Sequence, residues 1–311
     1  MKPKDISQLT IEEFKTFLDS FDTIMTDCDG VLWLGEVPIK GALEALKLLD
    51  RFGKKVLFVS NNNTRSIEDY LQKFQVIGYK ATPDQIMLPC QAIVWYLHHI
   101  GFKGKAFVVG SKAFIQALSD AGIDIVLGPK YVDENMDVIH NALRREPEIK
   151  AVIFDFDINL NWVKMIQVAA LLKRDDVLFF TGPRDKRLPI SKTISLIGPG
   201  NFVDILINYT GRQPIEFAKP SEILKKILIK RYAISNPERC IFVGDSLVAD
   251  MKFAELCGFQ KFWVSSGADN LESINDCEVI PDYYLPNLGM LLPLVQRLID
   301  CEAQDNNFSK S

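Results

Sequence analysis

The sequence has no apolar run that approaches the roughly 20 residues of a membrane-spanning helix. It also lacks an excess of basic residues, because 36 lysines and arginines stand against 40 aspartates and glutamates, a formal net charge of −4. A mildly acidic chain offers no general electrostatic attraction for nucleic acid or for an anionic membrane. We therefore expect neither nucleic acid nor a membrane as a partner.

Paired cysteines are absent as well. The chain has six cysteines, and no two of them are spaced as Cys-x-x-Cys: Cys28, Cys90, Cys240, Cys257, Cys277 and Cys301. In a chain of 311 residues this scatter is typical of reduced thiols rather than of a disulfide framework. No apolar segment follows Met1-Lys2-Pro3-Lys4-Asp5, so we expect no signal peptide. Together these features predict a cytoplasmic protein.

Apolar strands alternate with amphipathic helices along most of the chain. We predict strands within 23–26, 55–59, 106–109, 123–126, 151–154, 177–180, 240–243 and 262–264. We predict helices within 10–18, 41–50, 67–78, 92–99, 111–121, 162–172, 222–230 and 288–299. Residues 182–200 are predicted to be rich in loops, and residues 303–311 to be frayed. The alternation predicts an α/β protein with a parallel sheet and helices on its faces.

Two aspartates, Asp27 and Asp29, directly follow the first predicted strand. In open α/β sheets, ligands bind beyond the carboxyl ends of the strands. Two neighbouring carboxylates repel each other unless a cation or a shared proton intervenes. The functional interpretation is a metal-assisted site in which one aspartate can act as a nucleophile. The alternative is an Asp-Gly turn between strands, which requires no chemistry.

Three further loops carry polar residues, and each has a structural alternative. Ser60-Asn61-Asn62 follows a strand and can cradle an anion or simply cap a helix. Lys219 can neutralise a phosphate or lie on the surface as a solvated lysine. Asp245 and Asp250 can bind Mg²⁺, which takes oxygen ligands, or cap a helix. Together the four loops supply a nucleophile, a proton donor, a phosphate clamp and a metal seat, as phosphoryl transfer requires.

The order of these motifs resembles that of the haloacid dehalogenase superfamily phosphatases. It is most similar to the 4-nitrophenylphosphatase branch, which includes phosphoglycolate phosphatase and pyridoxal phosphate phosphatase (chronophin). The matching stretches span about 21–295: Asp27-Cys-Asp-Gly-Val-Leu-Trp33, Val59-Ser-Asn-Asn62, Lys219-Pro-Ser221, Gly244-Asp-x-x-x-x-Asp250 and Pro281-Asp-Tyr-Tyr284. The resemblance implies a Rossmann-like core of residues 1–83 and 216–311 with an inserted α/β cap domain, residues 84–215. It also implies a homodimer formed through the cap.

The resemblance implies a Mg²⁺-dependent phosphatase that hydrolyses small phosphomonoesters such as 4-nitrophenyl phosphate, phosphoglycolate-like or pyridoxal-phosphate-like compounds. Asp27 would be the nucleophile that forms an aspartyl-phosphate. Asp29 would protonate the leaving group and then activate water as a base. The alternative is a phosphate-binding or scaffolding relative that keeps the fold and has lost turnover.

The resemblance also implies how the phosphoryl group and the metal are held. Ser60 and the Asn61 amide would hold the phosphoryl oxygens, and Lys219 would bridge the nucleophile and the phosphate. The implied Mg²⁺ ligands are two carboxylates and one backbone carbonyl, with a further carboxylate in support: Asp27, Asp245, the carbonyl of Asp29, and Asp250.

Stretches of the predicted cap depart from the pattern of this family. Gly-Phe-Asp-x-His is here Asp155-Phe-Asp-Ile-Asn159, and Thr-Asn-x-Asp is Gly182-Pro-Arg-Asp185. Likewise, Pro-Gly-Thr-Gly-Ser is here Ile197-Gly-Pro-Gly-Asn201. These changes predict that neither phosphoglycolate nor pyridoxal phosphate is the best substrate. The basic run 184–187 is either a solvated loop or a contact for an anionic part of the substrate.

Overall fold

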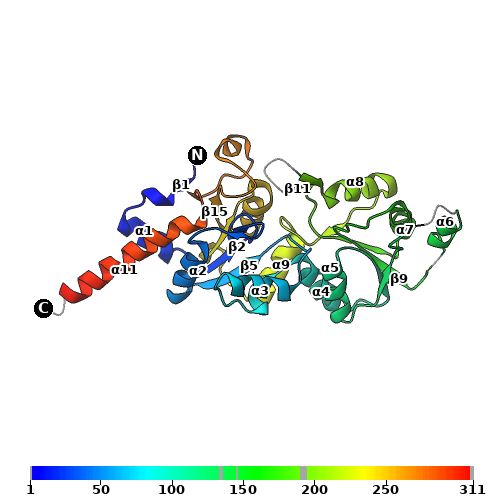
Figure 1. Ribbon diagram of the computed structural model, residues 1–311, viewed down its shortest axis with the longest axis horizontal. Helices are drawn as coiled ribbons and strands as arrows, with labels where there is room; N and C mark the ends of the chain where they lie inside the picture. Colours follow the sequence, from blue (N-terminus) through cyan, green and yellow to red (C-terminus); the bar gives the residue numbers. More distant parts are fainter. Residues whose placement is uncertain (1, 133–135, 145, 190–194, 309–311) are drawn as a thin grey trace. The chain divides into compact units, whose positions relative to one another are not determined.

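The computed structural model describes residues 2–132, 136–144, 146–189 and 195–308 (Figure 1). The chain divides into two compact units. The first unit comprises Met1–Ser60, Tyr70–Met87 and Leu228–Ser311, and the second comprises Asn61–Asp69 and Leu88–Ile227. The predicted limits of an inserted cap, residues 84–215, stay a prediction.

The first unit contains a seven-stranded sheet in the order β1-β16-β15-β14-β2-β5-β6, and all neighbouring strands are parallel. The strands are β1 (Lys4–Asp5), β2 (Thr23–Thr26), β5 (Lys55–Val59), β6 (Ile86–Met87), β14 (Cys240–Gly244), β15 (Gln260–Val264) and β16 (Tyr283–Leu285). β2 lies between β14 and β5, with Met25 opposite Phe242 and Leu57. Because parallel strands all end at one edge, the loops after β2, β5 and β14 begin side by side.

Helices of the first unit follow the strands in alternation. They are α1 (Ile11–Asp19), α2 (Ala42–Arg51), α10 (Lys252–Cys257) and α11 (Leu291–Phe308), while α3 (Ile67–Val76) and α9 (Glu222–Arg231) each contain residues of both units. Thr10 is the N-cap of α1 and forms a capping box with Glu13. A short antiparallel hairpin, β3 (Trp33–Leu34) and β4 (Val37–Pro38), follows the loop after β2.

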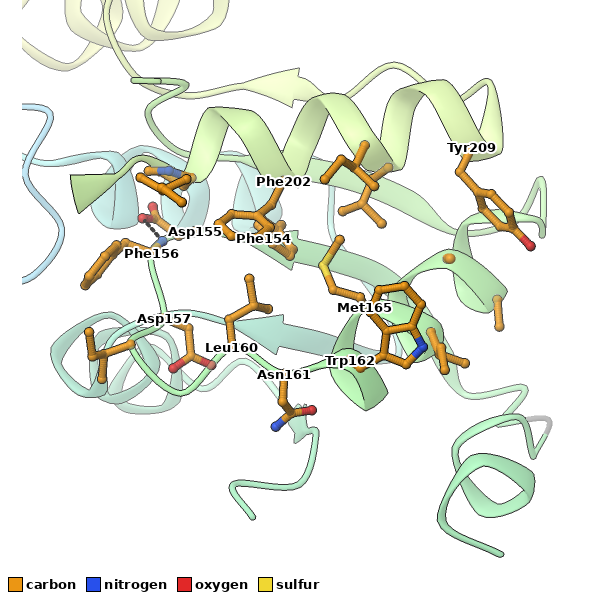
Figure 2. Close-up of a pocket in the computed structure, with 18 of the residues that line it drawn as sticks. Phe154, Asp155, Phe156, Asp157, Leu160, Asn161, Trp162, Met165, Phe202 and Tyr209 are labelled. Atoms are coloured by element: carbon orange, nitrogen blue, oxygen red, sulfur yellow. Dashed lines mark hydrogen bonds between the residues drawn. The ribbon is translucent and has the colours of Figure 1, made fainter. Parts of the chain in front are cut away.

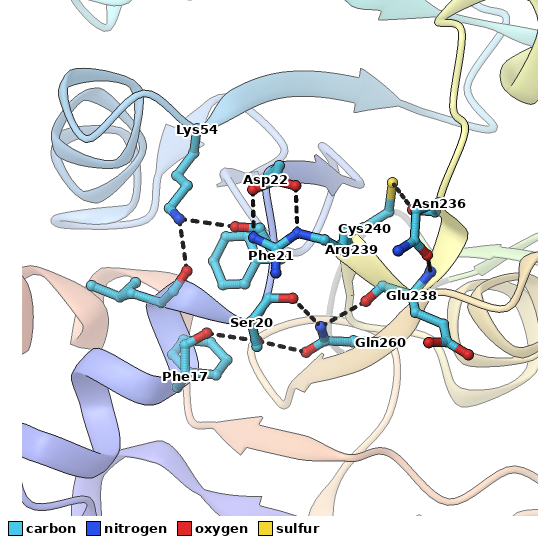
Figure 3. A network of polar contacts seen from close by, with 11 residues as sticks. Phe17, Ser20, Phe21, Asp22, Lys54, Asn236, Glu238, Arg239, Cys240 and Gln260 are labelled. Carbon is cyan, nitrogen blue, oxygen red and sulfur yellow. Dashed lines mark hydrogen bonds and ion pairs between the residues drawn. The ribbon is translucent and has the colours of Figure 1, made fainter.

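A polar network lies where β2, β14 and β15 begin (Figure 3). Lys54 donates hydrogen bonds from Nζ to the backbone oxygens of Leu18 and Phe21, at 2.7 and 2.9 Å. Gln260 donates from Nε2 to the backbone oxygens of Ser20 and Glu238. These bonds tie the chain entering β2 to its neighbours, at the sheet edge opposite the loops that follow the strands.

The second unit contains a five-stranded sheet in the order β13-β10-β9-β7-β8, again with parallel neighbours throughout. The strands are β7 (Lys105–Val109), β8 (Ile125–Leu127), β9 (Ile149–Phe154), β10 (Leu178–Thr181) and β13 (Ile215–Glu216). The helices are α4 (Pro89–His99), α5 (Lys112–Asp120), α6 (Met136–Ala142), α7 (Trp162–Leu172) and α8 (Pro199–Thr210). Val168 of α7 and Val203 of α8 share one buried apolar core with Phe107, Val152 and Phe179 of the sheet. The prediction of an α/β fold with parallel sheets is confirmed.

The structure adds detail to one prediction of local structure and contradicts another. Residues 182–200, predicted to be rich in loops, contain the antiparallel pair β11 (Arg187–Pro189) and β12 (Ser195–Ile197) and the start of α8, and residues 190–194 lie outside the described part of the chain. Pro199, which suggests a loop, instead occupies the first turn of a helix, where its missing N–H is not needed. Residues 303–308, predicted to be frayed, instead continue α11, and residues 309–311 of that prediction lie outside the described residues.

The six cysteines, all among the described residues, form no disulfide. Among the described residues, no helix is both long and apolar enough to cross a membrane.

Candidate active site

The loops after β2 and β14 bring Asp27 and Asp245 to adjacent positions at one edge of the first unit's sheet. The strands are in register, with Thr26 opposite Val243. The Asp27 backbone N–H extends this pairing by one residue, donating to the Val243 oxygen at 2.8 Å. A β-ladder therefore fixes the backbone at both aspartates, each of which directly follows a parallel strand.

Three carboxylates gather there. Asp27, Asp245 and Asp250 each offer one oxygen, and these oxygens lie within 4.8 Å of one another. The three residues are buried, with exposed fractions of 8, 6 and 2%. Carboxylates so close and so shielded from water repel one another, and a hard cation with oxygen ligands relieves that repulsion. The donor set fits Mg²⁺.

Glycines make room for this cluster. Gly30 has a left-handed backbone, with φ at +84°, and a Cβ added there would overlap Oδ2 of Asp245. A Cβ at Gly267 would overlap the same oxygen. Backbone therefore packs directly against the carboxylate from two sides, and a side chain at either position would displace it.

Hydrogen bonds hold the Asp245 carboxylate and the backbone around it. The backbone N–H of Ala268 donates to Asp245 Oδ2 at 2.6 Å, and the Trp263 indole donates to the Asp245 backbone oxygen at 2.9 Å. Ser266 donates from Oγ to the Gly30 oxygen at 2.6 Å. The loop after β15 thus fastens the two loops that carry the carboxylates.

Asp250 shapes the loop after β14. Its Oδ2 accepts from the backbone N–H groups of Asp245 and Ser246, both at 3.1 Å. It belongs to a π-helical turn, Leu247–Met251, a rare geometry that is frequent at functional sites. A Cβ at Gly244 would overlap the Asp250 side chain, so this close approach requires glycine. The supporting role implied for Asp250 is consistent with these contacts.

Asp29 is oriented by a residue that the sequence analysis did not single out. The Trp33 indole N–H donates to Asp29 Oδ1 at 2.8 Å, and the Gly30 N–H donates to the Trp33 backbone oxygen at 2.8 Å. The Trp33 ring is buried against Phe74, with ring centroids 5.3 Å apart, and the Lys73 ammonium lies 4.3 Å from its centroid. In the sequence, the position of Trp33 four residues after Asp29 is the feature that could have indicated this contact.

Ser60 follows β5 at the same edge and is buried. Its backbone N–H donates to the Met87 oxygen at 3.1 Å, and its Oγ lies 3.0 Å from the hydroxyl of Tyr70. Burial, and then the charge of Asp29, raise the pKa of Tyr70 well above its usual range, so the phenol stays neutral. Tyr70 therefore orients the Ser60 hydroxyl. This role of Tyr70 can be recognised only from the folded structure.

Asn61 and Lys219, distant in sequence, meet in the second unit. The Asn61 carboxamide donates from Nδ2 to the Lys219 backbone oxygen at 3.0 Å and accepts the Lys219 N–H at 2.8 Å. These two bonds fix the backbone of Lys219, whose side chain is buried. The other implied site residues, Asp27, Asp29, Ser60, Asp245 and Asp250, belong to the first unit.

Arg184 bears on the two interpretations of the basic run. Its Nη1 donates to Glu216 at 2.5 Å and its Nη2 to Asp204 at 2.7 Å. Lys186 also pairs with Asp204. Two carboxylates of the second unit thus compensate the arginine, which argues against a fixed positive charge held ready for a substrate anion.

Comparisons with known proteins give the following matches. A sequence model described as haloacid dehalogenase-like hydrolase matches residues 24–124, and a HAD-hydrolase-like model matches residues 216–291. Glycerol-3-phosphate phosphatase of Rattus norvegicus is 30% identical, over 93% of this chain and 95% of that protein. The 4-nitrophenylphosphatase of Schizosaccharomyces pombe is 30% identical, over 90% of this chain and 96% of its own.

A solved structure resembles the chain at lower identity. The crystal structure of a glycerol phosphate phosphatase from Mycobacterium tuberculosis in complex with magnesium superposes with a TM-score of 0.72 and 22% identity. The match covers 88% of this chain and 78% of the other. At this identity the likeness concerns the fold.

Proposed function

The chain belongs to the haloacid dehalogenase-like phosphatases, and on that premise we propose that it works through an aspartyl-phosphate on Asp27 with Mg²⁺ as its metal. The family and the hydrolysis of small phosphomonoesters, inferred from the motif order, are confirmed by the relatives. The roles of individual residues are the proposal. The observation that carries it is the cluster of three buried carboxylates where β2 and β14 end.

The proposed reaction has two steps. An oxygen of Asp27 attacks the phosphorus, the ester P–O bond breaks, and the leaving oxygen takes a proton from Asp29. Asp29, now ionised, then takes a proton from water, whose oxygen attacks the phosphorus and releases inorganic phosphate from Asp27. The hydrogen bond from Trp33 supports this assignment, because it fixes the orientation of the Asp29 carboxyl group.

The metal would be held by Asp27, Asp245 and the backbone carbonyl of Asp29, with Asp250 in support. When bound, Mg²⁺ neutralises negative charge on the phosphoryl oxygens and on the attacking carboxylate. The mutual repulsion of the buried carboxylates supports a divalent cation at this place.

The phosphoryl oxygens would be held by the Ser60 hydroxyl, by the Asn61 amide and by the Lys219 ammonium, which bridges them to the nucleophile. Since the Asn61 carboxamide is engaged with the Lys219 backbone, we assign the phosphoryl contact to the Asn61 backbone N–H. The Asn61 carboxamide instead positions Lys219. Asn61 therefore serves two phosphate contacts, its own through the backbone N–H and that of Lys219 through the side chain.

The test is an assay of the purified protein with 4-nitrophenyl phosphate and Mg²⁺, compared with Asp27→Asn. We expect phosphate release from the wild type, abolition by the substitution, and loss on chelation of the metal. A scaffold that has lost turnover would release no more phosphate than the variant, across several phosphomonoesters. Full wild-type activity in the presence of chelator would refute the metal assignment.

We propose a homodimer formed through the second unit. A cavity of about 1240 Å³ opens there between α7 and α8, and Figure 2 shows Phe202, Met165 and Leu160 lining it. Trp162 and Tyr209 at one end are 78 and 66% exposed, and large exposed aromatic side chains of this kind are typical of protein interfaces. Light scattering tests this: Trp162→Ser should shift the particle from dimer to monomer, and an unchanged mass would reject this surface.

The substrate and the location complete the proposal. The relatives act, by their names, on glycerol 3-phosphate and on 4-nitrophenyl phosphate, so we propose a small phosphoester of this size. Free thiols support the cytoplasm as the compartment.

A further inference from the structure

Asp155 is a buried carboxyl group that the proposed reaction does not use. It directly follows β9 in the second unit, with 3% of its surface exposed. Two amide groups donate to it: the Phe156 backbone N–H to Oδ1 at 2.5 Å, drawn in Figure 2, and the Asn63 carboxamide to Oδ2 at 2.6 Å. Both carboxylate oxygens thus face donors.

Asn63, the partner of Asp155, is held by two further contacts. Its Oδ1 accepts the backbone N–H of Cys90 at 3.1 Å, and its backbone oxygen accepts from Ser111 Oγ at 2.8 Å. The bond from Cys90 fixes the carboxamide so that its NH₂ group points at Asp155. A proton on either oxygen of Asp155 would face a donor, so the ionised carboxylate is the form that satisfies this arrangement.

The carboxylate also depends on Gly182. A Cβ at Gly182 would overlap Asp155 Oδ2, and it would lie 3.1 Å from Nδ2 of Asn63. Glycine at position 182 therefore leaves free the space that the Asp155 carboxylate occupies.

Packing alone does not account for an ionised group at this place. Burial, with a contribution from Asp185, raises the pKa of Asp155 to about 6 despite both hydrogen bonds. Burial, and then the charge of Asp155, raise the pKa of the neighbouring Cys90 thiol to about 12, so this thiol stays protonated. At neutral pH the protein therefore carries a buried negative charge on Asp155. This charge disfavours folding, but it maintains the hydrogen bond that holds the Asn63 carboxamide.

We propose that Asp155 is a positioning residue for the phosphate-binding segment, because it holds Asn63, which lies three residues after Ser60 and two after Asn61. The inference rests on the proposed roles of Ser60 and Asn61. Asn63 anchors the far end of this segment, while Ser60 continues β5 and Asn61 pairs with the backbone of Lys219. Loosening Asn63 lets the phosphate contacts move without removing any of them.

The experiment compares Asp155→Asn with the wild type across pH, using 4-nitrophenyl phosphate and Mg²⁺. Asparagine matches aspartate in size but turns an NH₂ group toward one of the two donors. We expect kcat/KM to fall by about tenfold at pH 8, in line with loss of a hydrogen bond to a charged group. The ratio of wild type to variant should approach one below about pH 5, where the wild-type carboxyl is protonated as well. A merely structural defect would give the same ratio at every pH.

Asn63→Ala tests the same contact from the other side. It should lower kcat/KM at pH 8 by a similar factor, and the double variant Asp155→Asn/Asn63→Ala should lose no more than either alone. Asp120→Asn, an exposed carboxyl on α5, is the control and should behave as wild type. If Asp155→Asn does not fold, the kcat/KM of Asn63→Ala at pH 8 tests the inference by itself.

Wild-type kcat/KM at pH 8 in Asn63→Ala, or losses that add in the double variant, would overturn the inference. Failure of the proposed function has a different signature, since wild type and Asp27→Asn would then release phosphate at the same rate, whether that rate is zero or not. An inactive Asp27→Asn together with a fully active Asn63→Ala rejects the positioning role and keeps the mechanism.

Discussion

The indole N–H of Trp33 donates to Oδ1 of Asp29 at 2.8 Å, from a ring that is buried against Phe74 and Tyr70. A general acid works only when its proton points at the leaving group. Because the indole fixes Asp29 Oδ1, it gives the carboxyl group a defined orientation. Trp33 is thus a positioning residue for the proposed acid.

Trp33→Phe removes the donor and keeps an aromatic ring in the core. We expect a loss of about tenfold in kcat with glycerol 3-phosphate, whose alkoxide leaving group needs a proton. With 4-nitrophenyl phosphate, whose leaving group needs little protonation, the loss should be about threefold or less. Equal losses for the two substrates would show that Trp33 acts through packing and not through the acid.

The two carboxylates after β2 have separable roles. Asp29→Asn should still form phosphoenzyme with 4-nitrophenyl phosphate, although turnover falls by roughly 10²–10⁴. Asp27→Asn should form none, because it lacks the nucleophile. Rapid acid quenching followed by peptide mass spectrometry measures the trapped phosphate. Its appearance on a residue other than Asp27 would contradict the assignment.

Gly30 offers a test of the metal site that removes no carboxylate. Gly30→Ala places a Cβ against Asp245 Oδ2 and should displace it, raising the Mg²⁺ concentration for half-maximal activity by about tenfold or more. Gly53→Ala is the matched control, because Gly53 has a similar left-handed backbone with nothing within 4 Å of the added Cβ. Both variants carry the same kind of backbone strain. A similar Mg²⁺ requirement in both would exclude a specific role for the space at Gly30.

The sequence was most informative where function depends on strand ends. Asp27 and Asp245 could be placed together because each follows an apolar run, and parallel strands present their carboxyl ends at one edge. Trp33 and Tyr70 could not be assigned roles in this way, since their contacts with Asp29 and Ser60 depend on side-chain packing across different elements. The helix α8 was missed because Gly198, Pro199 and Gly200 suggest a loop, whereas proline is compatible with the first turn of a helix.

The role of the Arg184 charge likewise could not be predicted from the sequence. Its basic neighbours suggested a contact for a substrate anion, but its partners Glu216 and Asp204 are distant in sequence. Arg184→Ala should therefore leave kcat/KM unchanged for glycerol 3-phosphate and for 4-nitrophenyl phosphate. It should lower the free energy of unfolding by about 1 kcal/mol or less, as is usual for partly exposed ion pairs. A selective loss with glycerol 3-phosphate would restore the substrate-contact interpretation.

Ionisation of Asp155 should lower the stability of the protein, whereas it should support activity. The ordinary pKa of an aspartate carboxyl, 3.8, applies to the unfolded chain, and burial raises the pKa of Asp155 to about 6 in the folded protein. The folded state therefore binds the proton more tightly. The contribution of this group to stability is fully present below about pH 4 and is lost as pH rises through about 6.

The size of this loss follows from the shift in pKa. A shift of about two units corresponds to roughly 3 kcal/mol of unfolding free energy. Asp155→Asn cannot titrate, so the difference in unfolding free energy between variant and wild type should move in favour of the variant as pH rises from about 4 to 7. Urea unfolding of both proteins at several pH values measures this difference, and Asp120→Asn serves again as the control. A difference that stays constant with pH would mean that Asp155 does not titrate in this range, and the convergence of activities expected at low pH would then lose its physical basis.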